Sequence, residues 1–432
     1  MSRDCNRKTC ELLEVLRLVM LNVTAKLDII QSMIKREEYL EKLRQLKDAN
    51  LIKVVTGIRR CGKSTLLKQF QDELRNMGVV DRNIITLNFE QAENEILLDW
   101  RKLHSFILKL TDPEKKNYVF LDEIQNVKEF EKAIDSLFTR ENLDIYITGS
   151  NAYMLSSELA TFLSGRYIEI KMLPLSFAEY LSAYEDRTDL STKFEEYIRF
   201  GSFPEVSNLI HSGAKAQVTN YLASIYATVL EKDILQRNDI RAQGSFNNVV
   251  KFLYDSIGSI VSPNRIANVL TDDGKRVDRA AVENYLKALT SSFVLYKVDR
   301  FDIKGKNVLK TLDKYYSVDT GLLSVIIGKD SGTDMGHLLE NIVYLELLRR
   351  GNDVWVGKVG DMEVDFVTRD KDGFTSYYQV AYSMLGKETR EREIRALDGI
   401  SDHNQKFVIT MDAGEYSYSG IRQMNVVDWL TR

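Results

Sequence analysis

The chain has 432 residues, which predicts roughly two to four domains rather than one. Hydrophobic residues make up 44% and charged residues 28%, as is usual for soluble proteins. The formal net charge of −4 excludes a uniformly basic nucleic-acid binder but leaves room for a local basic surface. Three cysteines are too few for a disulfide framework, and no apolar run reaches the ~18 residues of a membrane span. These features predict a cytoplasmic protein that does not bind membranes.

Residues 1–32 form an extension before the main fold. Apolar residues recur at helical spacing from Leu12 to Met20, and no cleavage-site pattern follows them. We therefore expect an amphipathic helix rather than a signal peptide. The sequence does not indicate what this helix does.

The strongest signal in the chain lies between residues 51 and 68. An apolar run ends at Val55, and Gly57 is followed four residues later by Gly62-Lys63-Ser64, which matches the phosphate-loop pattern. Apolar residues at helical spacing follow, so a strand, a loop and a helix are predicted in that order. We expect Lys63 to reach the β- and γ-phosphates and Ser64 to bind Mg²⁺. Backbone N–H groups of the loop would hold the phosphates, and its residues are Gly57, Ile58, Arg59, Arg60, Cys61, Gly62, Lys63, Ser64 and Thr65.

A second nucleotide motif follows at the end of another predicted strand. Four apolar residues, Tyr118 to Leu121, precede Asp122 and Glu123. The strand would deliver Asp122 to the Mg²⁺ ion, and Glu123 would polarise the attacking water. The strand predicted from Ile84 to Phe89 suggests a sheet in which an additional strand separates the loop strand from the acid strand.

Two further stretches supply candidates for the reaction. The strand Asp144 to Ser150 ends in small polar residues, and Ser150 or Asn151 would sense the γ-phosphate; an ordinary strand-end turn is an equal alternative. Arg166 precedes the strand from Tyr167 and would neutralise transition-state charge as an arginine finger. A surface arginine without a catalytic role is the alternative there.

Together these stretches resemble the bacterial and archaeal AAA-superfamily ATPases in which the ATPase is fused to a C-terminal region of unknown function. The resemblance also rests on Leu163-Ser-Gly-Arg166 and on Leu173-Pro-Leu-Ser-Phe-Ala-Glu-Tyr180. It extends from about residue 32 to the C-terminus and implies ATP and Mg²⁺ as ligands. It also implies a P-loop ATPase domain over residues 33–240, which a helical lid from Val218 to Arg237 would close. Cys61 stands where the family usually has a small or apolar residue, which is a conservative change.

Residues 241–325 have the element order of a winged helix. Three helices are predicted, and the second and third begin at the capping residues Ser262 and Asp278. A hairpin with a turn at residues 302–307 follows. The third helix could enter a major groove, and Lys304, Lys306, Lys310 and Lys314 would place positive charge on the wing. Many winged helices only pack against protein partners, so DNA remains one of two alternatives.

Residues 326–432 predict a small α/β unit of order α-β-β-β-α-β, similar to a restriction-endonuclease-type, PD-(D/E)XK core. Such cores hold Mg²⁺ with carboxylates and prepare a water with a lysine. Glu340 and Asp365 stand at the acid positions, but Gln379 replaces the third acid and Ala381 replaces the lysine. We therefore expect the fold with a vestigial, inactive site, unless Lys358 or Lys387 reaches it from another element.

Three functions from different classes follow. The first is Mg²⁺-dependent ATP hydrolysis coupled to a DNA- or protein-directed task, and it is the one we favour. The second is a nucleotide-gated switch or DNA-tethered regulator with negligible turnover. The third is an ATP-regulated DNA nuclease. The resemblance to AAA-type ATPases also implies an assembly of identical copies as one alternative, in which an arginine completes a neighbour's site. The sequence identifies neither the biological substrate nor the oligomeric state.

Overall fold

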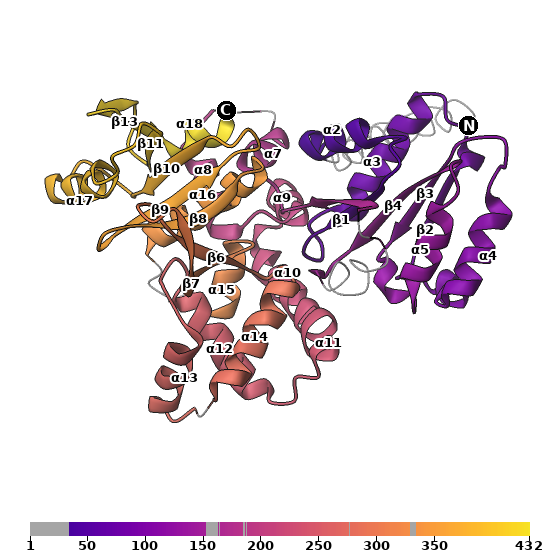
Figure 1. Cartoon of the computed structure of the whole chain (residues 1–432), viewed down its shortest axis with the longest axis horizontal. Helices are drawn as coiled ribbons and strands as arrows, with labels where there is room; N and C mark the ends of the chain where they lie inside the picture. The colour runs from indigo at the N-terminus through magenta and orange to yellow at the C-terminus, as the bar shows by residue number, and fades with distance from the viewer. Residues whose placement is uncertain are drawn as a thin grey trace, which may run out of the picture.

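The computed structural model describes residues 34–152, 163, 165–184, 186, 188–275, 277–328 and 334–432. The predicted extension, residues 1–32, lies outside these residues, as does Ser164 of the stretch before Arg166. One sheet lies at each end of the molecule, coloured indigo to magenta and orange to yellow in Figure 1. No helix among the described residues has the length and apolar character needed to cross a membrane.

The first sheet has five parallel strands in the order β2-β3-β4-β1-β5. An additional strand separates the loop strand β1 from the acid strand β3, as predicted; it is β4, whereas β2 forms an edge. Strands β1, β3 and β4 are buried along their whole length. The strands are β1 (Ile52–Thr56), β2 (Ile84–Asn88), β3 (Asn117–Asp122), β4 (Leu143–Gly149) and β5 (Tyr167–Lys171).

Helices cover both faces of this sheet because its strands alternate their side chains between two apolar clusters. On one face Phe70 of α3 packs against Phe120 and Tyr146, with ring centroids 6.4 and 5.4 Å away. On the other face Ile107 of α4 and Ile134 of α5 are fully buried against the sheet. The helices are α2 (Glu37–Leu46), α3 (Lys63–Asn76), α4 (Trp100–Leu110) and α5 (Phe130–Phe138).

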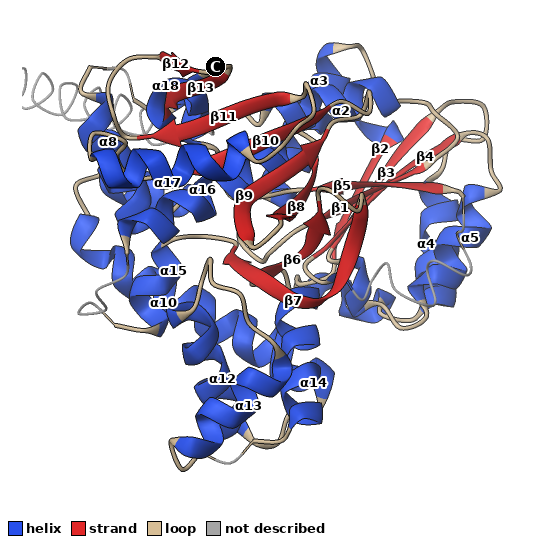
Figure 2. Cartoon of the chain, turned by 60° about the vertical axis from the view of Figure 1, so that its left-hand side comes forward, coloured by secondary structure: helices blue, strands red, loops and turns tan. Residues whose placement is uncertain are grey.

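A mostly helical region follows the first sheet. The predicted lid is a continuous helical segment that changes to π-helical geometry in its middle. Its parts are α10 (Val218–Thr228), the π-helical η6 (Val229–Leu235) and α11 (Gln236–Asn238), preceded by α7 (Phe177–Ser182), α8 (Leu190–Phe200) and α9 (Pro204–His211). Figure 2 shows that the next three helices project away from both sheets. They are α12 (Gln243–Asp255), α13 (Pro263–Asp272) and α14 (Arg279–Ser291).

The second sheet has eight strands in the order β12-β13-β11-β10-β9-β8-β6-β7. The predicted order α-β-β-β-α-β is present, from α16 (Met335–Arg349) through β8, β9, β10 and α17 (Lys387–Asp398) to β11. Short α15 (Gly321–Ile326) precedes it and α18 (Val426–Thr431) ends the chain. The strands are β6 (Leu295–Asp302), β7 (Asn307–Ser317), β8 (Asp353–Val359), β9 (Met362–Arg369), β10 (Thr375–Val380), β11 (Gln405–Thr410), β12 (Tyr416–Tyr418) and β13 (Ile421–Asn425).

The hairpin predicted as a free wing belongs to this second sheet. Strand β6 pairs in parallel with β8, where Arg300 lies opposite Val356. A boundary at residues 325 and 326 would therefore cut through one sheet. The reason is that β6 and β7 carry buried side chains, such as Val298 and Tyr316, that need a partner layer.

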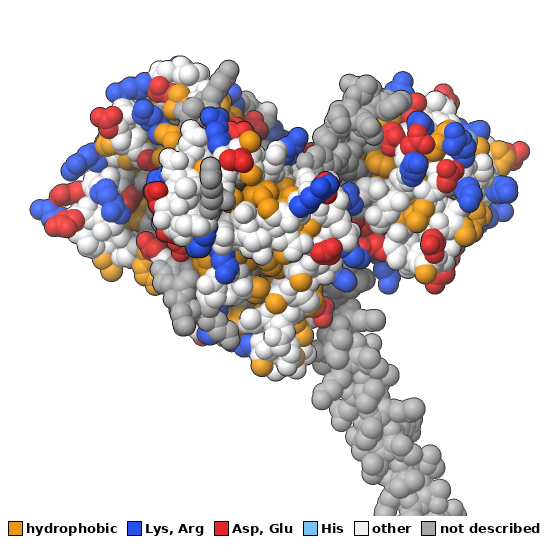
Figure 3. All heavy atoms as spheres, turned by 90° about the horizontal axis from the view of Figure 1, so that it is seen from below, with side chains coloured by type: hydrophobic (Ala, Val, Ile, Leu, Met, Phe, Trp, Pro, Cys, Tyr) orange, Lys and Arg blue, Asp and Glu red, His pale blue; other side chains and the backbone are white. Residues whose placement is uncertain are grey.

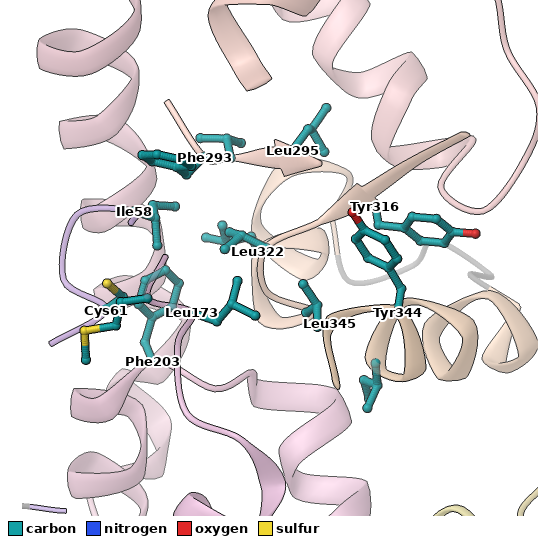
Figure 4. Packing of buried hydrophobic residues seen from close by; sticks show 14 of the residues in the cluster. Ile58, Cys61, Leu173, Phe203, Phe293, Leu295, Tyr316, Leu322, Tyr344 and Leu345 are labelled. Carbon is teal, nitrogen blue, oxygen red and sulfur yellow. The ribbon is translucent and has the colours of Figure 1, made fainter. Parts of the chain in front are cut away.

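The apolar core is shared between the two halves of the molecule. Ile58 and Cys61 of the phosphate loop are fully buried in the same cluster as Phe203, Phe293 and Leu322. Figure 4 shows these side chains close together. The back of the loop thus rests on side chains from the helical region and from the C-terminal half.

Candidate nucleotide site

The loop between β1 and α3 has the backbone geometry that phosphate binding requires. Gly57 and Gly62 have φ values of +152° and +107°, which side chains with a Cβ rarely adopt. A Cβ atom at Gly57 would lie 2.2 Å from the carbonyl oxygen of Met172. Arg60 also has a positive φ, of 70°. The loop therefore curves around the first turn of α3, where N–H groups point at a bound anion.

Lys63 lies at the centre of this loop and is almost fully buried. Its Nζ donates to the carbonyl oxygen of Gly57 at 3.0 Å and lies 3.3 Å from Oε1 of Glu123. Burial alone would lower the pKa of Lys63, but the charge of Glu123 outweighs it and the pKa is raised. Lys63 is therefore a fixed positive charge beside the loop.

Asp122 ends β3 and faces Ser64. Its Oδ1 accepts from Oγ1 of Thr148 at 2.5 Å, and its Oδ2 accepts from Nδ2 of Asn88 at 2.8 Å. Burial raises the pKa of Asp122, although a hydrogen bond from Ser64 opposes this. A hydroxyl and a carboxylate oxygen thus lie together, which fits Mg²⁺, an ion that binds few protein oxygens and keeps several waters.

Glu123 follows in a left-handed conformation with φ 54°. Such strain in a residue other than glycine is concentrated at functional sites. Its Oε2 accepts from Nε2 of Gln125 at 2.5 Å. Burial would raise the pKa of Glu123, but the charge of Lys63 and the Gln125 hydrogen bond lower it below its usual value. Glu123 is therefore an ionised carboxylate next to the loop, as a base for water requires.

Ser150 lies in the same polar network at the end of β4. Its Oγ donates to Oδ1 of Asp233 at 3.1 Å and accepts a long hydrogen bond from Gln125 at 3.5 Å. Sequence reasoning missed Gln125 and Asp233. Asp233 has no local pattern that marks it, since it reaches the site only when the lid packs over β4. Gln125 lies only two residues after Glu123, and this short spacing is the signal that could have marked it as a partner of that carboxylate.

A cavity of about 570 Å³ opens beside the loop, a size typical of small-ligand sites. Lys63, Ser64, Thr65 and Glu123 line it, together with Arg36, Arg59 and Arg60. Its remaining walls come from Ile34, Gly62, Glu90 and Leu175 and from helices α9 and α10. Most of the predicted loop residues and Glu123 are thus brought to one cavity, whereas Gly57, Ile58, Cys61 and Asp122 are not in its lining.

Arg36 supports the loop from behind, which the sequence did not reveal. Its Nη1 donates to the carbonyl oxygen of Cys61 at 2.9 Å and its Nη2 to that of Leu173 at 2.7 Å. Its Nε pairs with Oε1 of Glu179 at 2.8 Å. This buried guanidinium holds the peptide that precedes Gly62.

Arg166 does not reach this cavity. Its carbonyl oxygen accepts from the N–H of Ile52 at the start of β1, whereas the phosphate loop follows the end of that strand. Its guanidinium pairs with Asp135 at 2.5 Å and is 47% exposed. A finger role therefore stays a prediction that applies only to a neighbouring copy's site.

The predicted nuclease-like residues also come together, at the second sheet. Oε1 of Gln379 accepts from the N–H of Asp365 at 3.3 Å, and Oδ2 of Asp365 accepts from the N–H of Val380 at 2.8 Å. Lys314 lies among the acids: its Nζ is 2.8 Å from Oε1 of Glu340 and 2.7 Å from Oε1 of Glu363. A lysine from β7 thus lies among these acids, which the sequence did not predict, whereas Lys358 and Lys387 do not line the cavity beside them.

The position of Lys314 also contradicts the prediction that this lysine places positive charge on an exposed wing. The side chain is 3% exposed and ion-paired, so it is not available to DNA phosphates. Lys304 and Lys306 lie exposed in the turn between β6 and β7, whereas the side chain of Lys310 is outside the described part of the chain. On the face shown in Figure 3, basic and acidic side chains are interspersed rather than gathered into one basic surface.

Comparisons with known proteins agree with this site. The sequence profile of the AAA domain matches residues 49–181, and that of a domain of unknown function matches residues 191–333. An uncharacterized protein of Haemophilus influenzae is 40% identical over 408 residues, which cover 93% of this chain and 99% of the relative. An uncharacterized protein of Methanocaldococcus jannaschii is 28% identical over 399 residues, covering 88% and 85%.

Among solved structures, the Walker-type ATPase of Pyrococcus abyssi shares 17% identity at a TM-score of 0.47, covering 68% of this chain and 96% of that one. The phosphate loop and the buried acids at the end of β3 lie within the residues that the AAA profile matches, and the 40% identical relative is covered over nearly its whole length. The chain belongs to the AAA-superfamily ATPases that carry a C-terminal domain of unknown function.

Proposed function

We propose that this protein binds ATP with Mg²⁺ and hydrolyses it to drive a task of its C-terminal half. The observation that carries this proposal is Glu123, a buried and ionised carboxylate that lies 3.3 Å from Lys63 at the edge of the cavity. A protein that only holds ATP does not need such a base. The competing proposal, a nucleotide-gated switch, requires only the loop and Asp122.

Each residue has a defined part in the proposed reaction. Lys63 and the loop N–H groups hold the phosphates, and Ser64 and Asp122 would hold Mg²⁺, which neutralises charge on the transferred phosphoryl group. Glu123 orients and deprotonates the attacking water. Asn88 and Thr148 fix Asp122 by donating to both of its oxygens.

Nucleotide binding is tested by Lys63→Ala. A charge-assisted hydrogen bond contributes about 1.5–3 kcal/mol, so ATP should bind roughly 10- to 150-fold more weakly. Equilibrium titration with a fluorescent ATP analogue measures this. The matched control is Lys68→Ala, an exposed lysine on the same helix, which should bind as the parent does. Parental affinity in a Lys63→Ala protein with a native circular dichroism spectrum would remove the loop from the proposal.

We propose that the second-sheet site does not cleave DNA. Glu340 and Glu363 are already ion-paired with the one ammonium group of Lys314, and Gln379 adds no charge. Among the described residues no group of three or more His, Cys, Asp or Glu side chains is arranged to hold a metal. Linear, circular and single-stranded DNA should therefore stay intact with Mg²⁺ or Mn²⁺, with and without ATP. Metal-dependent cutting that disappears in Asp365→Ala would contradict this and favour the nuclease.

DNA is a candidate partner of the α12–α14 helices and the β6–β7 turn. Two exposed lysines, Lys304 and Lys306, support contact with phosphates. Arg279 on α14 is paired with Glu283 at 2.7 Å, which reduces its charge for this purpose. The alternatives for the same helices are a protein partner and a second copy of this chain.

A further inference from the structure

We propose that Arg59 distinguishes a nucleoside triphosphate from a diphosphate by leaving Asp233 for the terminal phosphate, and that this exchange releases the lid segment η6. The inference rests on the proposed function, because it assigns the regulation of the same site. It begins with the position of Arg59, which belongs to the phosphate loop and lines the cavity with Lys63 and Glu123.

The guanidinium of Arg59 is held between two carboxylates. Its Nε lies 3.0 Å from Oδ2 of Asp233, and its Nη1 pairs with Glu90. Glu90 follows β2, whereas Asp233 lies in the lid, so Arg59 joins the loop to two separate elements. Arg59 is 8% exposed and Asp233 is 1% exposed. An arginine at this place matches phosphate oxygens as well as it matches carboxylates.

Asp233 is the point where the lid is fastened to the ATPase sheet. Its carboxylate accepts from Oγ of Ser150 at 3.1 Å, and its carbonyl oxygen accepts from Nδ2 of Asn151 at 3.3 Å. Both partners follow β4. The residue lies within the π-helical η6, and π-helical turns inside α-helices are frequent at functional sites.

These contacts form a continuous chain that starts and ends at the cavity. It runs from Glu123 through Gln125, Ser150 and Asp233 to Arg59. Arg59 and Glu123 both line the cavity, together with Lys63 and Ser64. Arg59 therefore faces the same cavity as the candidate base, which is where a terminal phosphate would sit.

A terminal phosphate would compete directly with Asp233 for Arg59. Once Arg59 turns to the phosphate, Asp233 keeps Ser150 and the more distant Arg237, at 3.9 Å, but loses its strongest partner. A diphosphate brings no charge to that position and leaves the pair intact. Because η6 continues α10, and α10 packs against α15 at the C-terminal half, the release can be transmitted there.

The test measures binding and lid exchange in the full chain with Mg²⁺. Affinities for ADP and for a non-hydrolysable ATP analogue are compared in the parent and in Arg59→Met. Coupling between sites typically changes affinity by about 5- to 150-fold, and Arg59→Met should lose a preference of this size for the triphosphate while its ADP affinity is retained. Arg75→Met, a surface arginine of α3 paired with Asp72 and Asp81, is the matched control and should keep the parental preference.

Hydrogen exchange of residues 229–238 supplies the second readout. In the parent this segment should exchange faster with the triphosphate analogue than with ADP, and in Arg59→Met the two rates should be equal. Asp233→Asn should tighten binding of the analogue relative to ADP, and it serves as the test where Arg59→Met does not fold.

An unchanged triphosphate preference in Arg59→Met, or equal lid exchange with both nucleotides in the parent, would overturn the inference and leave ATP binding intact. A parent that binds neither nucleotide would overturn the proposed function itself.

Discussion

Glu123→Gln is expected to bind ATP as the parent does and to hydrolyse it about 10²- to 10⁴-fold more slowly. This range is what a positioned general base contributes to a reaction. The amide retains the shape of the side chain and its hydrogen bond with Gln125, but it cannot accept a proton from water. The substitution also removes the negative charge that lies 3.3 Å from Nζ of Lys63, so Lys63 is released from this ion pair.

Phosphate release under saturating ATP measures this loss, and titration with a fluorescent nucleotide confirms that binding is retained. The matched control is Glu129→Gln, a glutamate of the same region that pairs with Lys132 on the surface and should hydrolyse ATP at the parental rate. Equal turnover in Glu123→Gln and in the parent would remove Glu123 from the reaction and favour the nucleotide-gated switch.

The second large effect is expected in stability. Lys314→Met should lower the free energy of unfolding by about 3–5 kcal/mol, the usual cost of removing one partner from a buried ion pair. Glu340 and Glu363 would lose the ammonium group that lies 2.8 and 2.7 Å from them. Lys297→Met is the control, because Lys297 is 44% exposed and such surface pairs contribute about 1 kcal/mol or less.

The pH dependence of this loss has a defined sign. In the parent, burial would raise the pKa of Glu340, but the charge of Lys314 lowers it below the usual 4.5. The stabilisation is therefore present above pH 4.5 and falls as the pH drops below it. Without Lys314 burial prevails, Glu340 becomes a neutral acid at higher pH, and the variant should approach the parent's stability as the solution is acidified. Urea unfolding of the parent and the variant at pH 7 and at pH 5 measures how far the variant approaches the parent; a difference in the free energy of unfolding that stays constant would contradict this role of Glu340.

The sequence by itself determined the parts of this protein whose geometry is local. The phosphate loop is specified within a few residues, because Gly57 and Gly62 permit backbone angles that other residues rarely adopt. The buried acid strand and the α-β-β-β-α-β order of the C-terminal unit could also be predicted, because the spacing of apolar residues along the chain reflects which side chains are buried.

Only the tertiary structure decided which distant residues meet. Arg59 and Asp233 are 174 residues apart, and no spacing connects them. Lys314 was expected on an exposed wing because its strand follows three helices; pairing of β6 with β8 instead buries it among Glu340, Glu363 and Asp365. Arg166 was a candidate for the reaction, but the parallel register of β1 and β5 places it at the opposite end of the strands from the loop. Contacts of this kind depend on how sheets pair and pack, which one chain's local pattern does not encode.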